Sequence, residues 1–126
     1  MTTLYIPFTR VAEATEVFLN TYGCVPDELT VERIDVSNNP FGYLEHFQTR
    51  WDEGCTFINM EHDIVPWPGA LQELVACPRN WCFFGYLADI DFVATNAAPF
   101  GLVKFGASLI AAMPDVWGLM NRRFAN

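Results

Sequence analysis

Short β-prone runs alternate with stretches of helical spacing along this chain, and the alternation constrains the fold more than any other feature. Strands are predicted near residues 4–6, 30–36, 55–60 and 81–87. Such alternation is typical of parallel strands joined by right-handed helical crossovers. We therefore expect one α/β domain over residues 1–126, a three-layer sandwich whose sheet is mostly parallel with one antiparallel edge.

Capping residues mark the predicted helices. Thr9 precedes the first helix and Gly23 ends it, whereas Asn39 precedes a second helix whose first residue is Pro40. A third helix is predicted from Pro68 to Pro78, and two more over residues 101–112 and from residue 114 onward. Residues 89–95 alternate in polarity, so they form either the hairpin partner of the strand at 81–87 or its continuation.

Composition and charge exclude some classes of protein. Hydrophobic residues make up 52% of the 126 residues, which is enough for a packed core. The net charge of −8 argues against a nucleic-acid partner, which would need a basic face. No run approaches the roughly 18 apolar residues of a membrane span, and the first residues lack the pattern of a signal peptide. We therefore expect a cytoplasmic protein that keeps its four cysteines reduced.

The stretch over residues 55–68 carries the strongest functional signal. An apolar run leads directly into Glu61-His62-Asp63 and then into a turn rich in proline. If the strand continues through them, Glu61 and Asp63 lie on one face at the rim of the sheet, where open α/β sheets bind ligands, and His62 points away in a structural role. Two carboxylates there suit Mg²⁺ or Mn²⁺. The alternative is a loop with two solvated acids.

Three segments taken in order resemble a known family. They are residues 6–10 (IPFTR), 33–39 (RIDVSNN) and 57–63 (FINMEHD), each at the end of a predicted strand. Together they are similar to the nucleotide-sugar-binding half of GT-A-fold glycosyltransferases, in particular to small phage-type and bacterial members. The resemblance implies a GT-A/Rossmann-like fold and a metal-dependent transfer of sugar from a nucleotide-diphosphate sugar to an acceptor that the sequence does not identify.

The resemblance also implies roles for particular residues. Glu61-His62-Asp63 would be a variant of the family's Asp-any-Asp motif, with Glu61 and Asp63 holding Mn²⁺ or Mg²⁺ on the diphosphate. Asp35, Ser37 and Asn38 would hold the nucleoside, although Asp35 is equally explained as a turn-forming acid. Arg10 would pair with phosphate, or is an exposed charge at a helix start.

Aromatic residues and a second acid pair complete the candidate residues. Trp67 and Trp81 would stack on a base or a sugar ring, or belong to the core. Asp89 and Asp91 are candidates for the general base that deprotonates an acceptor hydroxyl, or else form the solvent face of a strand.

Two other functions stay open. The segment between Asp35 and Glu61 is shorter than is usual in the family, which allows a catalytically inactive GT-A-like binding domain. The negative charge allows a small acidic inhibitor or adaptor that binds another protein. A nucleotide-sugar site would require Asp35, Glu61 and Asp63 to approach one another at a single cleft.

Overall fold

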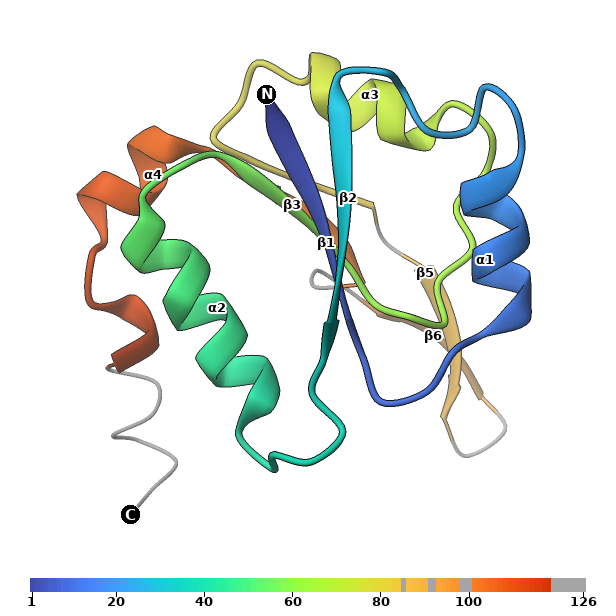
Figure 1. Ribbon diagram of the computed structural model, residues 1–126, viewed down its shortest axis with the longest axis horizontal. Helices are drawn as coiled ribbons and strands as arrows, with labels where there is room; N and C mark the ends of the chain where they lie inside the picture. The colour runs from blue at the N-terminus through green and yellow to red at the C-terminus, as the bar shows by residue number, and fades with distance from the viewer. Residues whose placement is uncertain (85, 91–92, 98–100, 119–126) are drawn as a thin grey trace.

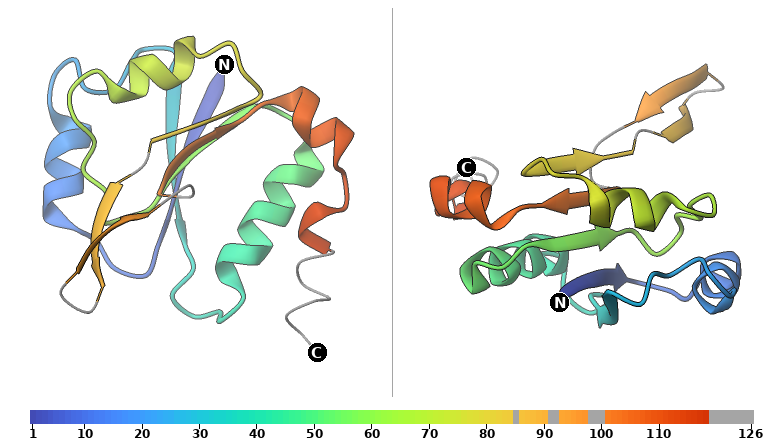
Figure 2. Two further views of the ribbon diagram at one scale, coloured as in Figure 1. Left: turned by 180° about the vertical axis from the view of Figure 1, so that it is seen from behind. Right: turned by 90° about the horizontal axis from the view of Figure 1, so that it is seen from above.

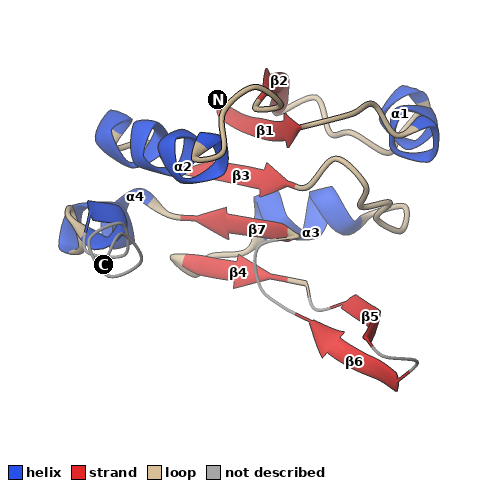
Figure 3. Ribbon diagram, turned by 90° about the horizontal axis from the view of Figure 1, so that it is seen from below, coloured by secondary structure: helices blue, strands red, loops and turns tan. Residues whose placement is uncertain are grey.

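A five-stranded mixed sheet forms the centre of the computed structural model, which describes residues 1–84, 86–90, 93–97 and 101–118. Its strand order is β2-β1-β3-β7-β4 (Figure 3). Strands β1 (Thr2–Phe8), β2 (Leu29–Asp35) and β3 (Phe57–Met60) are parallel. Strand β7 (Leu102–Phe105) runs antiparallel to both β3 and β4 (Trp81–Phe83). The mixed α/β class is therefore confirmed, with antiparallel pairing confined to one side of the sheet.

Helices lie on both sides of this sheet. Helices α1 (Glu13–Asn20) and α3 (Ala70–Ala76) lie on one side, and α2 (Gly42–Glu53) and α4 (Ala107–Ala112) on the other (Figure 1). Strands β5 (Tyr86–Ile90) and β6 (Val93–Ala97) pair with each other as a separate antiparallel ladder. This ladder projects beyond the β4 edge of the sheet (Figure 2). No helix in the described ranges is long and apolar enough to cross a membrane.

Alternating side chains of the central strands supply two hydrophobic clusters. On one face, Leu4, Ile58 and Leu102 pack with Phe18 of α1 and Leu71 of α3. The other face is more aromatic, and its cluster consists of Tyr5, Phe47, Trp51, Phe57, Val103, Phe105, Ile110 and Trp117. All four residues of β3 are buried, because this strand is covered on both faces. The sequence pattern of short, nearly continuous apolar strands follows from this double burial.

Several predicted boundaries are wrong. The helix predicted over 101–112 is a strand over 102–105 followed by α4, because the apolar side chains at 102–105 are needed on both faces of the sheet. The strand predicted over 81–87 ends at Phe83, and a second strand, β5, begins at Tyr86. Residues 89–90 end β5 and residues 93–95 pair back onto it in β6, so neither the hairpin partner nor the continuation predicted for residues 89–95 is correct. Of the last predicted helix, residues 116–118 are helical and the remainder lies outside the described residues.

The first two helices begin later than predicted. Helix α1 starts at Glu13 without a side-chain cap, so Thr9 does not cap it. Helix α2 starts at Gly42, and Asn39 instead accepts a hydrogen bond from the backbone N–H of Phe41 at 2.9 Å. The side chain of Asn39 thus orders the turn that precedes the helix.

The expectation of four reduced cysteines is wrong for one pair. Cys77 and Cys82 form a disulfide, whereas Cys24 and Cys55 are free. Helix α3 ends at Ala76 and β4 begins at Trp81, so a tight turn brings the two Cα atoms to 6.8 Å. That separation is within the range that a disulfide bridges.

Candidate functional site

The carboxyl ends of the three parallel strands meet at one edge of the sheet. Phe8 pairs with Asp35 between β1 and β2, and Tyr5 pairs with Asn59 between β1 and β3. This register places Glu61, the last residue of the ladder with β7, level with Pro7 and Ile34, one residue before Asp35. Because β1 lies between β2 and β3, the two backbones are about 10 Å apart. The sequence therefore correctly placed its candidate acids at one edge.

The chain turns immediately after β3. The backbone N–H of Glu61 still donates to the carbonyl of Gly101 at 2.8 Å, which extends the ladder with β7. The N–H of Ile64 then donates to the carbonyl of Glu61 at 3.2 Å and closes a turn over residues 61–64. The extended geometry assumed for Glu61-His62-Asp63 is therefore wrong beyond Glu61, and the relation between the two acids is that of a turn.

The carboxylates of Glu61 and Asp63 nevertheless interact. Burial, followed by the negative charge of Asp63, raises the pKa of Glu61, and His62 partly offsets this. Burial also raises the pKa of Tyr43, with further contributions from the charges of Glu61 and Asp63. The first turn of α2 thus brings a phenol to the acid pair, a residue that the sequence analysis missed because Tyr43 follows no recognisable motif.

The turn is held by a buried hydrogen bond. The hydroxyl of Thr15 in α1 is almost fully buried and donates to the carbonyl of Ile64 at 3.0 Å. On the other side of the turn, the N–H of Ala70 donates to the carbonyl of Trp67 at 3.1 Å and leads into α3. The acid pair is therefore fixed between two helices, with Asp63 exposed and Glu61 half-buried.

Asp35 has a local role at the end of β2. Its Oδ1 atom accepts hydrogen bonds from the backbone N–H of Ser37 at 2.9 Å and from the Ser37 hydroxyl at 2.5 Å. Both bonds lower the pKa of Asp35, the side-chain bond more than the backbone bond. Asp35 therefore acts as a turn-forming acid, which is one of the two roles that the sequence predicted for it. Ser37 and Asn38 are exposed in the same turn.

A polar hollow of about 220 Å³ lies between this turn and α2. Asp35, Asn39, Glu45, Thr49 and Arg50 contribute to its lining, whereas Glu61 and Asp63 do not. The acids at the two strand ends therefore share an edge of the sheet, but the single cleft predicted for Asp35, Glu61 and Asp63 is not this hollow, which only Asp35 lines.

The other candidate residues do not all lie at this edge, since Trp81 pairs with Phe105, which pairs with Phe57 at the start of β3, and so lies at the opposite edge. Arg10 is exposed and borders a small cavity of about 30 Å³ that His62 also lines. The Trp67 side chain is 48% exposed, and its ring meets the Phe84 ring edge-on with a centroid distance of 4.4 Å. Trp81 is also about half exposed, so neither tryptophan is a core residue. Asp89 lies in β5, and Asp91 lies outside the described residues.

A buried histidine in α2 was also missed by the sequence analysis. His46 is 4% exposed, and its Nε2 atom lies 2.9 Å from Oδ1 of Asn59 in β3. Since an amide oxygen only accepts, Nε2 carries the proton. Burial lowers the pKa of His46 to about 4, so the ring is neutral near pH 7. This pair ties α2 to the central strand beneath the candidate site.

The acids that the sequence predicts as cation ligands are two carboxylates. No group of three His, Cys, Asp or Glu side chains suited to a metal ion occurs among them. Mg²⁺ is commonly held by one or two carboxylates together with substrate phosphates and water. The pair Glu61 and Asp63 therefore fits a divalent cation that arrives with a diphosphate, and does not fit a cage built from protein ligands alone.

Comparisons with known proteins add no assignment. The chain matches no protein-family model, and neither the curated proteins nor the solved structures include a significant match to it. The class that the structure defines is a mixed α/β fold with an acid pair at the carboxyl edge of its parallel strands.

Proposed function

We propose that this chain is a GT-A-like domain that binds a nucleotide-diphosphate sugar together with Mn²⁺ or Mg²⁺ and acts as a glycosyltransferase. One observation carries the proposal: Glu61 and Asp63 lie in one turn directly after a central parallel strand. Ligands of open α/β sheets bind at this edge.

The electrostatics of the pair support cation binding. The pKa of Glu61 is raised because its carboxylate is partly buried beside a second negative charge. A divalent cation would offset both the cost of burying the Glu61 carboxylate and its repulsion from Asp63. The ionised pair would therefore be more stable with a cation bound than without one. Asp63 is the more exposed acid and would contact the cation directly, with Glu61 acting beside it or through water. The bound cation would stabilise the negative charge that develops on a diphosphate leaving group.

Neighbouring residues would contact the phosphate, ribose and base of the nucleotide-diphosphate sugar. Arg10 leaves β1 at the same edge and carries a charge suited to phosphate. Asp35 accepts both hydrogen bonds from Ser37 at Oδ1, so its Oδ2 atom would accept from a ribose hydroxyl of a donor that extends from the acid pair to the hollow beside α2. The exposed ring of Trp67 offers a stacking surface beyond β7. A base for the acceptor hydroxyl is assigned to Asp89 or Asp91 by the sequence alone.

Calorimetry with sugar nucleotides tests the proposal. UDP- and GDP-sugars are titrated into the protein with and without Mn²⁺, and binding is expected only with the cation. Asp63→Asn keeps the shape of the side chain and removes its charge, so cation-dependent affinity should fall at least tenfold, or about 1.4 kcal/mol. Glu61→Gln should weaken binding less. Asp52→Asn, an exposed acid in the last turn of α2, is the matched control and should bind as the parent does.

The outcomes separate the three functions. Binding accompanied by transfer or hydrolysis of the sugar supports the enzyme, and binding without turnover indicates the inactive domain. Parental affinity of Asp63→Asn in Mn²⁺ would exclude the acid pair as a cation site. Absence of binding to every sugar nucleotide would favour the acidic adaptor.

A further inference from the structure

The disulfide between Cys77 and Cys82 lies at an accessible position. Cys77 follows the last residue of α3, and Cys82 is the middle residue of the edge strand β4. Both cysteines are half-buried and line an open hollow of about 380 Å³, together with Arg79, Trp81 and Phe83. A small thiol can therefore approach the sulfur atoms without unfolding of the domain.

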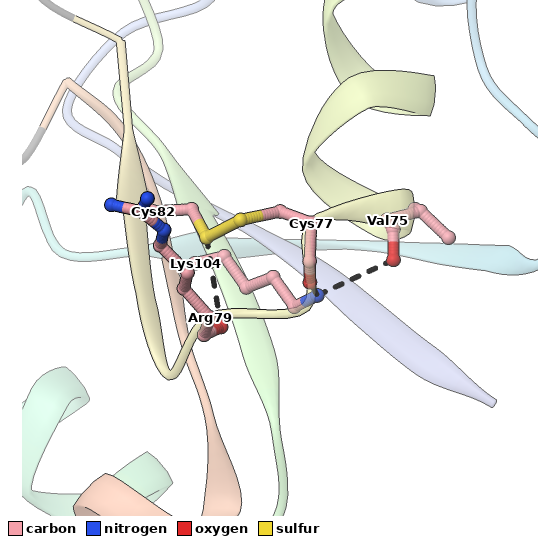
Figure 4. Close-up of a disulfide and its surroundings, with 5 residues drawn as sticks. All are labelled: Val75, Cys77, Arg79, Cys82 and Lys104. Carbon is pink, nitrogen blue, oxygen red and sulfur yellow. Dashed lines mark hydrogen bonds between the residues drawn. A yellow bond between two sulfur atoms is a disulfide. The ribbon is translucent and has the colours of Figure 1, made fainter.

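Lys104 provides a second connection between the same two elements. Its Cα pairs with that of Cys82 across β7 and β4. Its ammonium group donates to the carbonyl of Cys77 at 2.7 Å and to that of Val75 at 3.3 Å (Figure 4). These carbonyls belong to the C-terminal end of α3, where a cation is favoured by the helix dipole. The side chain of Lys104 thus joins α3 to the sheet through hydrogen bonds that do not involve the sulfur atoms.

Apolar packing of α3 is also independent of the disulfide. Leu71 and Leu74 are 0% and 2% exposed and belong to the cluster on that face of the sheet. The disulfide closes only the short turn between α3 and β4, and short loops gain less from a cross-link than long ones. Opening the disulfide is therefore expected to leave α3 in place.

Groups around Cys77 and Cys82 would stabilise the reduced thiol and its thiolate. Sγ of Cys82 lies 3.6 Å from the carbonyl oxygen of Arg79, a contact to which a thiol can donate a hydrogen bond. The ammonium of Lys104 is bound to the backbone carbonyl of Cys77 and so places a positive charge at that residue. Cations near a cysteine favour its thiolate, which is the form that reacts in thiol–disulfide exchange.

We propose that Cys77 and Cys82 form a reversible dithiol–disulfide pair that exchanges with a small-molecule thiol of the glutathione class while the domain stays folded. The thiolate of the small molecule attacks one sulfur, which forms a mixed disulfide and releases the other cysteine as a thiolate that takes up a proton. A second small thiol then attacks the mixed disulfide. Two small thiols are thereby oxidised to one disulfide, and the protein gains two electrons and two protons as two thiols. The disulfide between Cys77 and Cys82 forms again by the reverse reaction, in which the disulfide of the small molecule is the oxidant.

The first test is a redox titration of the folded chain. The Cys55→Ser variant serves as the parent, because it lacks the exposed free thiol that would form its own mixed disulfides. The protein is equilibrated with reduced and oxidised glutathione at a series of ratios, alkylated, and analysed by mass spectrometry and far-UV circular dichroism. Two thiols should appear and disappear together at Cys77 and Cys82 with an unchanged spectrum. If these thiols appear only in denaturant, or if reduction abolishes the helical signal, the proposal is wrong.

The second test addresses Lys104. Lys104→Met keeps much of the side-chain length and removes the ammonium, so the disulfide and the apolar packing of Leu71 and Leu74 are then what hold α3. Reduction should raise the unfolded fraction of Lys104→Met at least about tenfold more than it raises that of the parent. Equal effects in the two proteins would exclude Lys104 as the second connection. If oxidised Lys104→Met does not fold, the titration of the parent alone decides whether the pair is reversible.

Discussion

Replacing Gly42 by Ala tests how closely α2 approaches the end of β2. A Cβ atom at residue 42 would lie 2.7 Å from Cβ of Val36 and 3.2 Å from the Val36 carbonyl oxygen. Both atoms are fixed to the backbone of a buried residue, so α2 or the turn after β2 has to move. Overpacking of this kind costs about 1–3 kcal/mol. Helix propensity alone acts in the opposite direction, since it favours Ala over Gly by up to about 1 kcal/mol.

The sign of the change therefore separates the two effects. We expect Gly42→Ala to lower the free energy of unfolding by about 1–2 kcal/mol, measured by urea denaturation with tryptophan fluorescence. Val36→Ala alone should cost about 2 kcal/mol through lost apolar burial and a cavity. The double variant should show nearly additive effects, because alanine at residue 36 keeps the Cβ atom and the carbonyl oxygen that the new methyl group meets. A Gly42→Ala protein as stable as the parent, or a double variant in which Val36→Ala restores most of the stability lost in Gly42→Ala, would refute the close approach to the backbone of residue 36.

Two further predictions concern buried polar groups on the α2 face of the sheet. The folded pKa of His46, about 4, lies below the ordinary value of 6.5, so the unfolded chain binds the extra proton first and stability falls as pH decreases below 6.5. Relative to His46→Gln, the parent should lose about 2 kcal/mol between pH 7 and pH 5 in urea titrations, and parallel profiles would contradict this. The indole N–H of Trp51 donates to the carbonyl of Met113 at 2.7 Å. Trp51→Phe should therefore cost about 1–3 kcal/mol in the same assay, and a neutral change would show that this bond does not hold α4 to α2.

Local patterns predicted the parallel half of the sheet well. The strands at 2–8, 29–35 and 57–60 were found because each short apolar run is followed by polar and turn-forming residues. The edge at which Asp35, Glu61 and Asp63 lie followed from this alternation, because parallel strands end on the same side.

The antiparallel half depends on contacts that local patterns do not contain. Residues 102–105 show apolar spacing that a helix and a strand satisfy equally, and their pairing with β3 and β4 decides between the two. The single strand predicted at 81–87 is divided between two ladders for the same reason.

The sequence named the acids of the candidate site but not the local structure around them. The turn over residues 61–64 depends on the hydroxyl of Thr15, a residue distant in sequence. Tyr43 and His46 belong to the site region only because α2 packs across β3, and no spacing within the sequence indicates this. The disulfide was missed because the expected reducing compartment outweighed the short separation of Cys77 and Cys82.

The position of β7 has a consequence for synthesis on the ribosome. Strand β3 pairs with β1 on one side as soon as residues 57–60 have emerged, but its other side is completed only by residues 102–105. Until then, a strand whose four residues are all buried in the finished domain presents an open hydrogen-bonding edge. A nascent chain arrested before residue 102 should therefore engage chaperones or aggregate through Phe57–Met60, and extension through β7 should abolish this behaviour within a few added residues.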